Sequence, residues 1–233
     1  MAKNKLQKFA ENETFSNLLQ PTNEEVWRKN HPIKGQWNST FFKNSNPIVL
    51  ELGCGKGEYT INLSKMYPNK NFIGVDIKGA RLWKGAKEAS ENSMPNVAFV
   101  RTHIENIASF FAKDEVSEIW ITFPDPQPRV SKARKRLTSS RFLSRYQQLA
   151  KQNAIVHLKT DSQQLHEYTK ALVQQNGLKL HICTNNLYGS GIADDILSIR
   201  TFYESMFLEQ GMPITYIKFE LDNQKVLNEP ELE

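Results

Sequence analysis

Cysteine is scarce in this chain of 233 residues, which contains only Cys54 and Cys183. Two cysteines are too few for a disulfide framework, so a reducing cytoplasm is the expected compartment. No apolar run approaches the ~20 residues that a membrane-spanning helix needs. The first eight residues include three lysines and no apolar core, which excludes a secretory signal there. These absences favour a cytoplasmic protein that does not engage a membrane.

Acidic residues are missing altogether from position 126 to position 160. The same window holds nine basic residues, namely Arg129, Lys132, Arg134, Lys135, Arg136, Arg141, Arg145, Lys151 and Lys159. The whole chain has 30 basic and 25 acidic residues, so 21 basic residues stand against 25 acidic ones outside this window. A mildly acidic body with one concentrated basic segment is typical of a polyanion-binding protein. A solvated helix face is the alternative interpretation.

The order of apolar patterns predicts an α/β fold. With 39% hydrophobic residues, the chain suits one sizeable domain at 47–233, preceded by a polar N-terminal arm at 1–46. Short apolar strands alternate with helical patterns, which predicts βαβ units and a mainly parallel, twisted sheet with helices on both faces. The expected strands are 48–52, 71–75, 97–100, 118–122, 154–158, 178–183 and 214–221, and the expected helices are 58–66, 79–91, 104–111, 140–151, 163–176 and 202–209.

A glycine-rich segment follows the first expected strand of the main domain and reads Glu-Leu-Gly-Cys-Gly-Lys-Gly from Glu51 to Gly57. Glycines at such a turn let a ligand approach the backbone closely. Asp76 ends the next strand, where an acidic residue can accept hydrogen bonds from ribose hydroxyls. NAD and S-adenosylmethionine both bind in this way. The G-x-G-x-G spacing favours S-adenosylmethionine, because Glu51 would repel a pyrophosphate but suits a zwitterionic methionine tail.

Asp125 lies between Pro124 and Pro126, directly after the expected strand 118–122. Proline fixes its own φ and restricts the residue before it, so this carboxylate is expected to be rigid. In an open parallel sheet, ligands bind beyond the carboxyl ends of the strands, where the glycine loop, Asp76, Asp125 and Asp161 all fall. A rigid carboxylate followed at once by cations suggests a site that recognises a nucleobase while the basic segment holds phosphates.

Four motifs together resemble a known family. They are Glu51-x-Gly53-x-Gly55-x-Gly57, Phe123-Pro124-Asp125-Pro126, Lys159-Thr160-Asp161 and Thr201-x-Tyr203-Glu204. Over about residues 1–221, the chain resembles the bacterial single-chain tRNA (guanine-N7-)-methyltransferases. The resemblance implies a Rossmann-like S-adenosylmethionine-dependent methyltransferase that acts on N7 of a guanosine in the tRNA variable loop. No metal ion and no obligatory protein partner are expected, and the state is expected to be a monomer or a homodimer.

The resemblance also implies roles for individual residues. Asp125 is the implied catalytic-site aspartate, and the implied cofactor contacts are Glu51, Gly53, Gly55, Gly57, Asp76 and His103. The implied contacts to the substrate nucleotide are Arg129, Asp161, Thr201, Tyr203 and Glu204. The implied RNA-contacting segment is 131–136, with Lys132, Arg134, Lys135 and Arg136. The chain departs from the family pattern at His103, where Asp or Asn is common, and at Gln127, where an aromatic residue is frequent.

The expected reaction needs no general base, because N7 of guanine carries a free in-plane lone pair and can attack a sulfonium methyl group directly. The product ring becomes positively charged. We therefore expect Asp125 to position the base through its N–H edge and to stabilise the developing charge, while near-attack geometry supplies much of the remaining acceleration. Lys3, Lys5 and Lys8 in the arm are expected to add a second, poorly ordered grip on the RNA.

Several of these residues also have structural alternatives. Asp161 can be the N-cap of the helix that starts near Ser162. The Thr-x-x-Glu pattern from Thr201 to Glu204 fits a capping box, which is compatible with a helix start that contacts the nucleotide. His103 is expected to be a polar residue at the rim of the site rather than a catalyst.

Three other functions are considered. An amino-methyltransferase acting on adenine N6 or cytosine N4 is disfavoured because Gln127 separates the prolines and no aromatic residue follows them. A non-catalytic RNA-binding protein with a vestigial cofactor pocket is disfavoured by the intact glycine loop, and a cofactor-binding titration would separate the two. An NAD-dependent dehydrogenase is disfavoured by the loop chemistry and by the basic segment.

Overall fold

A computed structural model describes residues 5–231 of the chain. The chain divides into two compact units, Met1–Val116 and Ser117–Glu233. Lys3, which we assigned to the RNA-gripping arm, lies outside the described residues. Within residues 5–231, no helix combines the length and the apolar character needed to cross a membrane.

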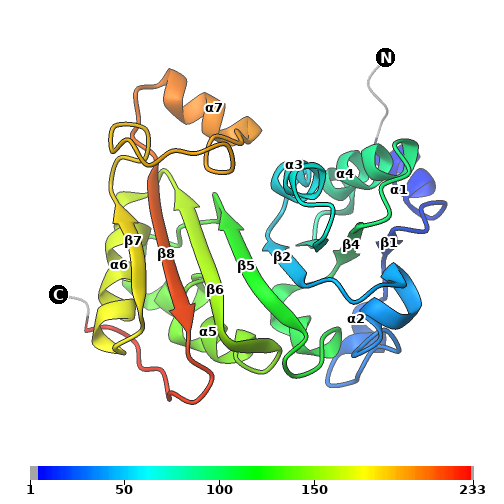
Figure 1. Cartoon of the computed structure of the whole chain (residues 1–233), viewed down its shortest axis with the longest axis horizontal. Coiled ribbons are helices and arrows are strands. Elements are labelled where there is room, and N and C mark those ends of the chain that lie inside the picture. The colour runs from blue at the N-terminus through cyan, green and yellow to red at the C-terminus, as the bar shows by residue number, and fades with distance from the viewer. Residues whose placement is uncertain (1–4, 232–233) are drawn as a thin grey trace. The chain divides into compact units, whose positions relative to one another are not determined.

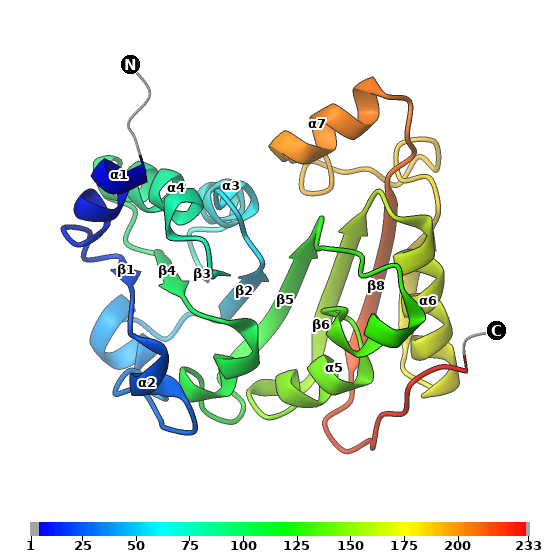
Figure 2. The same ribbon diagram turned by 180° about the vertical axis from the view of Figure 1, so that it is seen from behind.

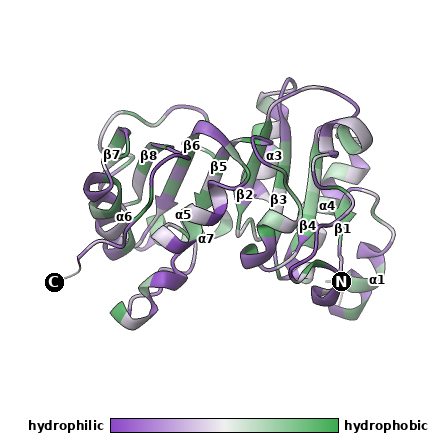
Figure 3. Cartoon of the chain, turned by 90° about the horizontal axis from the view of Figure 1, so that it is seen from below, coloured by the Kyte–Doolittle hydropathy of each residue, from purple (hydrophilic) through white to green (hydrophobic). Residues whose placement is uncertain are grey.

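The first unit is built on parallel strands in the order β1-β4-β3-β2 (Figure 1). Strands β2 and β3 are buried along their whole length, and both are mainly hydrophobic, as Figure 3 shows for β3. Complete burial explains why they read as continuous apolar runs rather than as an alternating pattern. The elements are α1 (Lys5–Asn12), β1 (Leu18–Leu19), α2 (Asn23–Val26), the π-helix η1 (Trp37–Phe42), β2 (Ile48–Leu52), α3 (Glu58–Met66), β3 (Asn71–Asp76), α4 (Gly79–Glu91), β4 (Val97–Arg101) and the 3₁₀ helix η2 (Ile104–Ser109).

The N-terminal segment differs from the poorly ordered arm that we expected, because residues 5–46 are packed into this unit. Asn12 Nδ2 donates to the carbonyl of Gly79 at 3.0 Å, and Asn17 Nδ2 donates to the carbonyl of Ala86 at 2.9 Å. Strand β1 pairs with β4, and Trp37 is fully buried against Phe111 with ring centroids 5.5 Å apart. The few apolar residues of the segment are therefore sufficient to dock it, although its composition is polar.

The second unit has the strand order β5-β6-β8-β7, in which β8 runs antiparallel to both neighbours. Helices α5 and α6 lie on the same face of this sheet, and α7 lies beyond the carboxyl ends of β5 and β6 (Figures 1 and 2). The elements are β5 (Val116–Thr122), the 3₁₀ helix η3 (Val130–Lys135), α5 (Ser140–Tyr146), β6 (Ala150–Thr160), α6 (Gln163–Gln175), β7 (Leu180–Thr184), α7 (Phe202–Glu209) and β8 (Thr215–Leu221).

The α/β class with mainly parallel strands is confirmed, and so are most of the expected elements. Two expected helices are wrong. Residues 104–111 form only the 3₁₀ helix η2, because Asn106 and Ser109 bond to Asn23 and to the carbonyl of Val26 instead of supporting an α-helix. The helix expected at 140–151 ends at Tyr146, since the following residues turn into β6, which begins at Ala150.

Candidate functional site

The glycine loop of the first unit connects β2 to α3 and is held against β3. Gly53 donates its N–H to the carbonyl of Val75 at 2.8 Å. Gly53, Gly55 and Gly57 all have positive φ, at 75°, 57° and 75°, a region that residues with a Cβ rarely adopt. A Cβ on Gly57 would lie 2.6 Å from Cε1 of Phe99, whereas a Cβ on Gly55 would meet nothing within 4 Å. Gly57 therefore permits close packing, and Gly55 leaves the backbone open to a ligand.

Asp76 organises this loop from the end of β3. Its Oδ2 accepts the N–H of Gly55 at 2.9 Å, and its Oδ1 accepts the N–H of Lys78 at 2.7 Å. The side chain is 8% exposed. Each carboxylate oxygen has two lone pairs, so this arrangement leaves acceptor capacity for the ribose hydroxyls that the sequence assigned to it. The bond to the glycine loop was not predicted from the sequence.

Glu51 is buried at the end of β2, where its Oε2 accepts the N–H of Thr60 at 2.8 Å and its hydroxyl at 2.6 Å. These bonds orient the carboxylate at the first turn of α3, where the helix dipole favours negative charge. Cys54 packs in an apolar cluster with Leu18 and Phe99, and burial raises the pKa of its thiol well above the usual range. Cys54 is therefore a packing residue in this loop.

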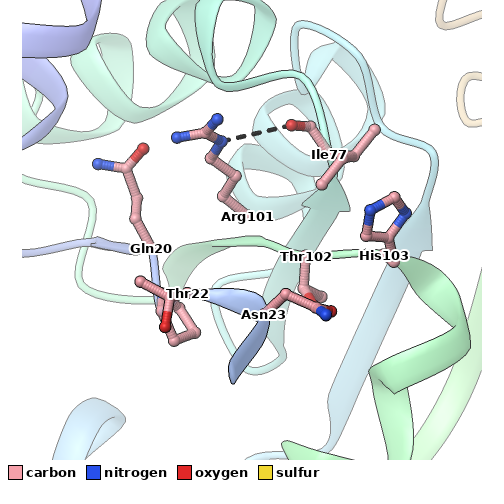
Figure 4. A pocket seen from close by; sticks show the side chains of 8 residues that line it. Gln20, Thr22, Asn23, Ile77, Arg101, Thr102 and His103 are labelled. Atoms are coloured by element: carbon pink, nitrogen blue, oxygen red, sulfur yellow. Dashed lines mark hydrogen bonds between the residues drawn. The ribbon is translucent and has the colours of Figure 1, made fainter. Parts of the chain in front are cut away.

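A cavity of about 300 Å³ opens beside the end of β4 (Figure 4). His103 is exposed on its wall at the start of η2, and Ile77, which directly follows Asp76, is 42% exposed. The remaining lining residues are Gln20, Pro21, Thr22, Asn23, Arg101 and Thr102. An exposed aliphatic side chain next to a carboxylate, with polar groups around it, fits a nucleoside. The contribution of the N-terminal segment was missed, since nothing local in residues 20–23 indicates a site.

Gly55 and Gly57 allow a matched test. We expect Gly57→Ala to destabilise the protein strongly, because its Cβ would collide with the Phe99 ring in a packed core. We expect Gly55→Ala to cost only about 1 kcal/mol of backbone strain while weakening S-adenosylmethionine binding. Thermal unfolding and a cofactor titration measure both effects. Equal destabilisation by the two substitutions would contradict the division of roles between these glycines.

In the second unit, Asp125 is exposed in a bent loop that follows β5. Phe123 and Gln127 on either side have positive φ, at 48° and 46°. The N–H of Phe123 donates to the carbonyl of Lys159 at 2.8 Å, and the N–H of Gln127 donates to Oδ1 of Asp125 at 3.2 Å. Gln164 Nε2 donates to the carbonyl of Pro128 at 2.9 Å. The loop is thus attached at both ends, in agreement with a fixed carboxylate.

The basic segment splits into exposed and buried side chains. Arg129, Lys132, Arg134 and Lys135 are exposed on and just before η3. Arg136 is only 1% exposed, and Lys159 is fully buried. The expectation that Arg136 and Lys159 belong to the polyanion-binding segment is therefore wrong. The guanidinium group of Arg136 packs on Tyr168, and the ammonium group of Lys159 pairs with Glu204.

Asp161 is half-buried after β6, and burial raises the pKa of its carboxyl group. It is not the N-cap of α6. Ser162 occupies that position, since its hydroxyl accepts the N–H of Leu165 at 3.2 Å. The carboxylate of Asp161 is thus not used for capping, although it follows a strand at the same end of this sheet as Asp125.

The capping box at the start of α7 is confirmed: Thr201 Oγ1 accepts the N–H of Glu204 at 3.1 Å, and Glu204 Oε2 accepts the N–H of Thr201 at 3.4 Å. Glu204 is fully buried, so its carboxylate faces the interior rather than the surface. Tyr203 is 39% exposed, so among the three predicted nucleotide contacts of this motif it is the one that a ligand can reach.

Lys159 forms a buried ion pair with Glu204. This structural role of Lys159 was not predicted from the sequence. Its Nζ lies 2.7 Å from Glu204 Oε1 and donates to the carbonyls of Leu197 and Ile199 at 2.6 and 3.2 Å. Burial lowers the pKa of Lys159, and the Glu204 carboxylate opposes this shift. Tyr188 also donates to Glu204 Oε1, at 2.5 Å. A lysine that directly continues an apolar strand was the sequence signal that could have revealed this role.

Comparison with known proteins identifies the family. Residues 45–217 match the model of a family described as putative methyltransferase. The tRNA (guanine-N(7)-)-methyltransferase of Bacteroides fragilis is 52% identical over all of this chain and 92% of its own length. That of Porphyromonas gingivalis is 55% identical over 87% of this chain and 83% of its own length. The chain belongs to the tRNA (guanine-N(7)-)-methyltransferase family.

Solved structures confirm the fold expected for this family. The 16S rRNA methyltransferase KamB aligns with a TM-score of 0.62 at 13% identity, covering 84% of this chain and 98% of that one. A 16S rRNA (adenine(1408)-N(1))-methyltransferase from Catenulisporales acidiphilia, solved with the cosubstrate SAM, aligns with a TM-score of 0.54 at 14% identity over 81% of this chain and 91% of that one. At these identities the likeness establishes a Rossmann-like methyltransferase fold.

Proposed function

We propose that this protein transfers the methyl group of S-adenosylmethionine to N7 of a guanosine in the variable loop of tRNA. The observation that carries the proposal is the identity of 52% to a tRNA (guanine-N(7)-)-methyltransferase over the full chain. The glycine loop, with Gly55 open to a ligand and Asp76 holding it, supports cofactor binding by the first unit. Because tRNA is the proposed substrate, the cytoplasm is the proposed compartment. We propose no obligatory protein partner.

In the first unit, the proposed cofactor contacts are the backbone of the glycine loop, Glu51, Asp76 and His103. Asp76 retains acceptor capacity for ribose hydroxyls, and Glu51 carries the negative charge that an ammonium group would require. When bound, S-adenosylmethionine supplies an electrophilic methyl group. His103 is exposed on the wall of the cavity, so it is proposed as a contact at its polar rim.

In the second unit, Asp125 is the proposed catalytic residue. Its Oδ1 accepts one backbone N–H at 3.2 Å, so both oxygens keep lone pairs that can accept the N–H edge of guanine. Methylation at N7 makes the ring positively charged, and a carboxylate already held in place stabilises that charge without reorganisation. No proton has to leave N7, so no general base is assigned.

Other residues of the second unit are proposed to bind the nucleotide. Arg129, Asp161 and Tyr203 are accessible enough to contact it. Thr201 and Glu204 are buried in the capping box, so we propose that they act by fixing the start of α7 rather than by touching the base. Exposed cations on η3 are proposed to contact RNA phosphates, namely Lys132, Arg134 and Lys135.

The deciding experiment is transfer of labelled methyl from S-adenosylmethionine to tRNA that lacks N7-methylguanosine, followed by reductive chain cleavage at the modified base. Cleavage at a variable-loop guanosine is the expected result. Label in adenosine or cytidine would replace this proposal with an amino-methyltransferase. Cofactor binding without any transfer to tRNA would also overturn it.

The exposed cations of η3 make a separate prediction. Replacing Lys132, Arg134 and Lys135 together with Ala should reduce the slope of log affinity against log salt by about 2 to 3, since each neutralised phosphate contributes about 0.7–0.9. Lys179, whose side chain is 67% exposed just before β7, provides a control that should leave the slope unchanged. Filter binding of tRNA at several salt concentrations measures the slopes. A wild-type slope in the triple variant would show that η3 does not contact the RNA backbone.

A further inference from the structure

Arg136 stands out in the basic segment because its guanidinium is buried, while the neighbouring Lys135 is exposed. Its Nε donates to the carbonyl of Gln127 at 3.2 Å. The guanidinium carbon lies 4.2 Å from the centroid of the Tyr168 ring, which is a close cation–π contact. A buried arginine held in this way is not available to a phosphate in solution.

Tyr168 is itself fixed from the other side. Its hydroxyl donates to Oε2 of Glu229 at 2.5 Å, and Oε1 of Glu229 accepts the N–H and the hydroxyl of Ser140 at 3.1 and 2.7 Å. Burial, together with the hydrogen bond to Glu229, raises the pKa of Tyr168, so it stays a neutral phenol. Helix α5, helix α6 and the segment after β8 are thereby joined behind the Arg136 side chain.

Gln127, which accepts the hydrogen bond from Arg136, also holds the proposed catalytic carboxylate of Asp125. The N–H of Gln127 donates to Asp125, and the carbonyl of Gln127 accepts from Arg136. Gln127 has a φ of 46°, and a non-glycine residue persists in such a conformation only when its surroundings over-determine it. The charge-assisted bond from Arg136 supplies one of those constraints, since hydrogen bonds to ionised groups are the stronger ones.

We infer that Arg136 is a positioning residue that acts through Gln127 to hold Asp125, and that it is not a phosphate ligand. This inference rests on the proposed role of Asp125. Removing Arg136 would free the Gln127 carbonyl and relax the loop. Because a displacement of about 1 Å at a reacting group can lower a rate by about 10²-fold, the expected consequence is a loss of turnover rather than a loss of RNA affinity.

The test compares Arg136→Met with Lys135→Met, measuring kcat, KM for tRNA and the salt dependence of tRNA binding. We expect Arg136→Met to lower kcat by about 10- to 100-fold with a wild-type salt slope. We expect Lys135→Met to reduce the slope by about one. A slope reduced by about one in Arg136→Met, with kcat unchanged, would make Arg136 a phosphate ligand and overturn the inference.

Arg136→Lys guards against a variant that does not fold, because it keeps the charge but loses the planar stack and the Nε donor. It should lower kcat and speed hydrogen exchange of the Gln127 amide. Wild-type exchange at that amide would contradict the inference that Arg136 holds Gln127 in place. A double variant with Asp125→Asn separates the two proposals. If Arg136 acts through Asp125, the two losses should be far from additive. Additive losses would overturn the inference. Full activity of Asp125→Asn alone would overturn the role of Asp125 and this inference with it, while leaving the proposed methyl transfer to tRNA in place.

Discussion

Replacing Asp125 with Asn is expected to lower turnover by about 10²–10³-fold, the range seen when one preorganised electrostatic group is removed from an active site. The amide oxygen can still accept the N–H of Gln127, so the loop should keep its shape. It carries no charge, however, and cannot stabilise the positive ring that N7 methylation produces. Single-turnover methyl transfer to tRNA, at saturating S-adenosylmethionine, measures the loss directly.

The affinity for S-adenosylmethionine should remain close to that of the wild type, because Asp125 belongs to the second unit and the proposed cofactor contacts belong to the first. Asp195 is an exposed aspartate of the second unit, and Asp195→Asn is a matched control that should turn over normally. Wild-type turnover in Asp125→Asn would remove this residue from the mechanism.

The second large effect is expected for stability. Lys159→Met should lower the free energy of unfolding by about 3–5 kcal/mol, the cost of leaving one member of a buried ion pair without its partner. Lys159 and Glu204 are both fully inaccessible and 2.7 Å apart. The substitution would also leave the carbonyls of Leu197 and Ile199 without this donor. Urea unfolding followed by circular dichroism measures the change.

Two comparisons make this prediction specific. Lys65→Met breaks a 2.8 Å pair with Glu88 whose side chains are 50% and 37% exposed, and exposed pairs contribute only about 0–1 kcal/mol. Lys159→Met combined with Glu204→Gln should recover part of the lost stability, since no uncompensated charge remains buried. A double variant less stable than Lys159→Met alone would contradict the assignment of the loss to an unpaired carboxylate.

Local patterns were sufficient for much of the fold. Helices α3, α4 and α7 and strand β2 have the bounds that the pattern of apolar and polar residues predicted. The Thr201–Glu204 capping box could also be predicted from the sequence, since its two hydrogen bonds join residues three apart. The α-helix predicted at 104–111 was wrong because Asn106 and Ser109 donate hydrogen bonds to distant parts of the chain, at Asn23 and Val26.

The same distinction holds for the candidate site. The sequence by itself determined the family, the glycine loop, the rigid Asp125 segment and the location of the cations along the chain, because these depend on residue type and spacing. Only the tertiary structure decided which cations face water. Arg136 resembles its basic neighbours in the sequence, and Lys159 differs from them only because it continues an apolar strand. Both are nevertheless buried, Arg136 against Tyr168 and Lys159 against Glu204. A buried charge is tolerated only beside a partner, and both partners come from helices that lie far along the chain.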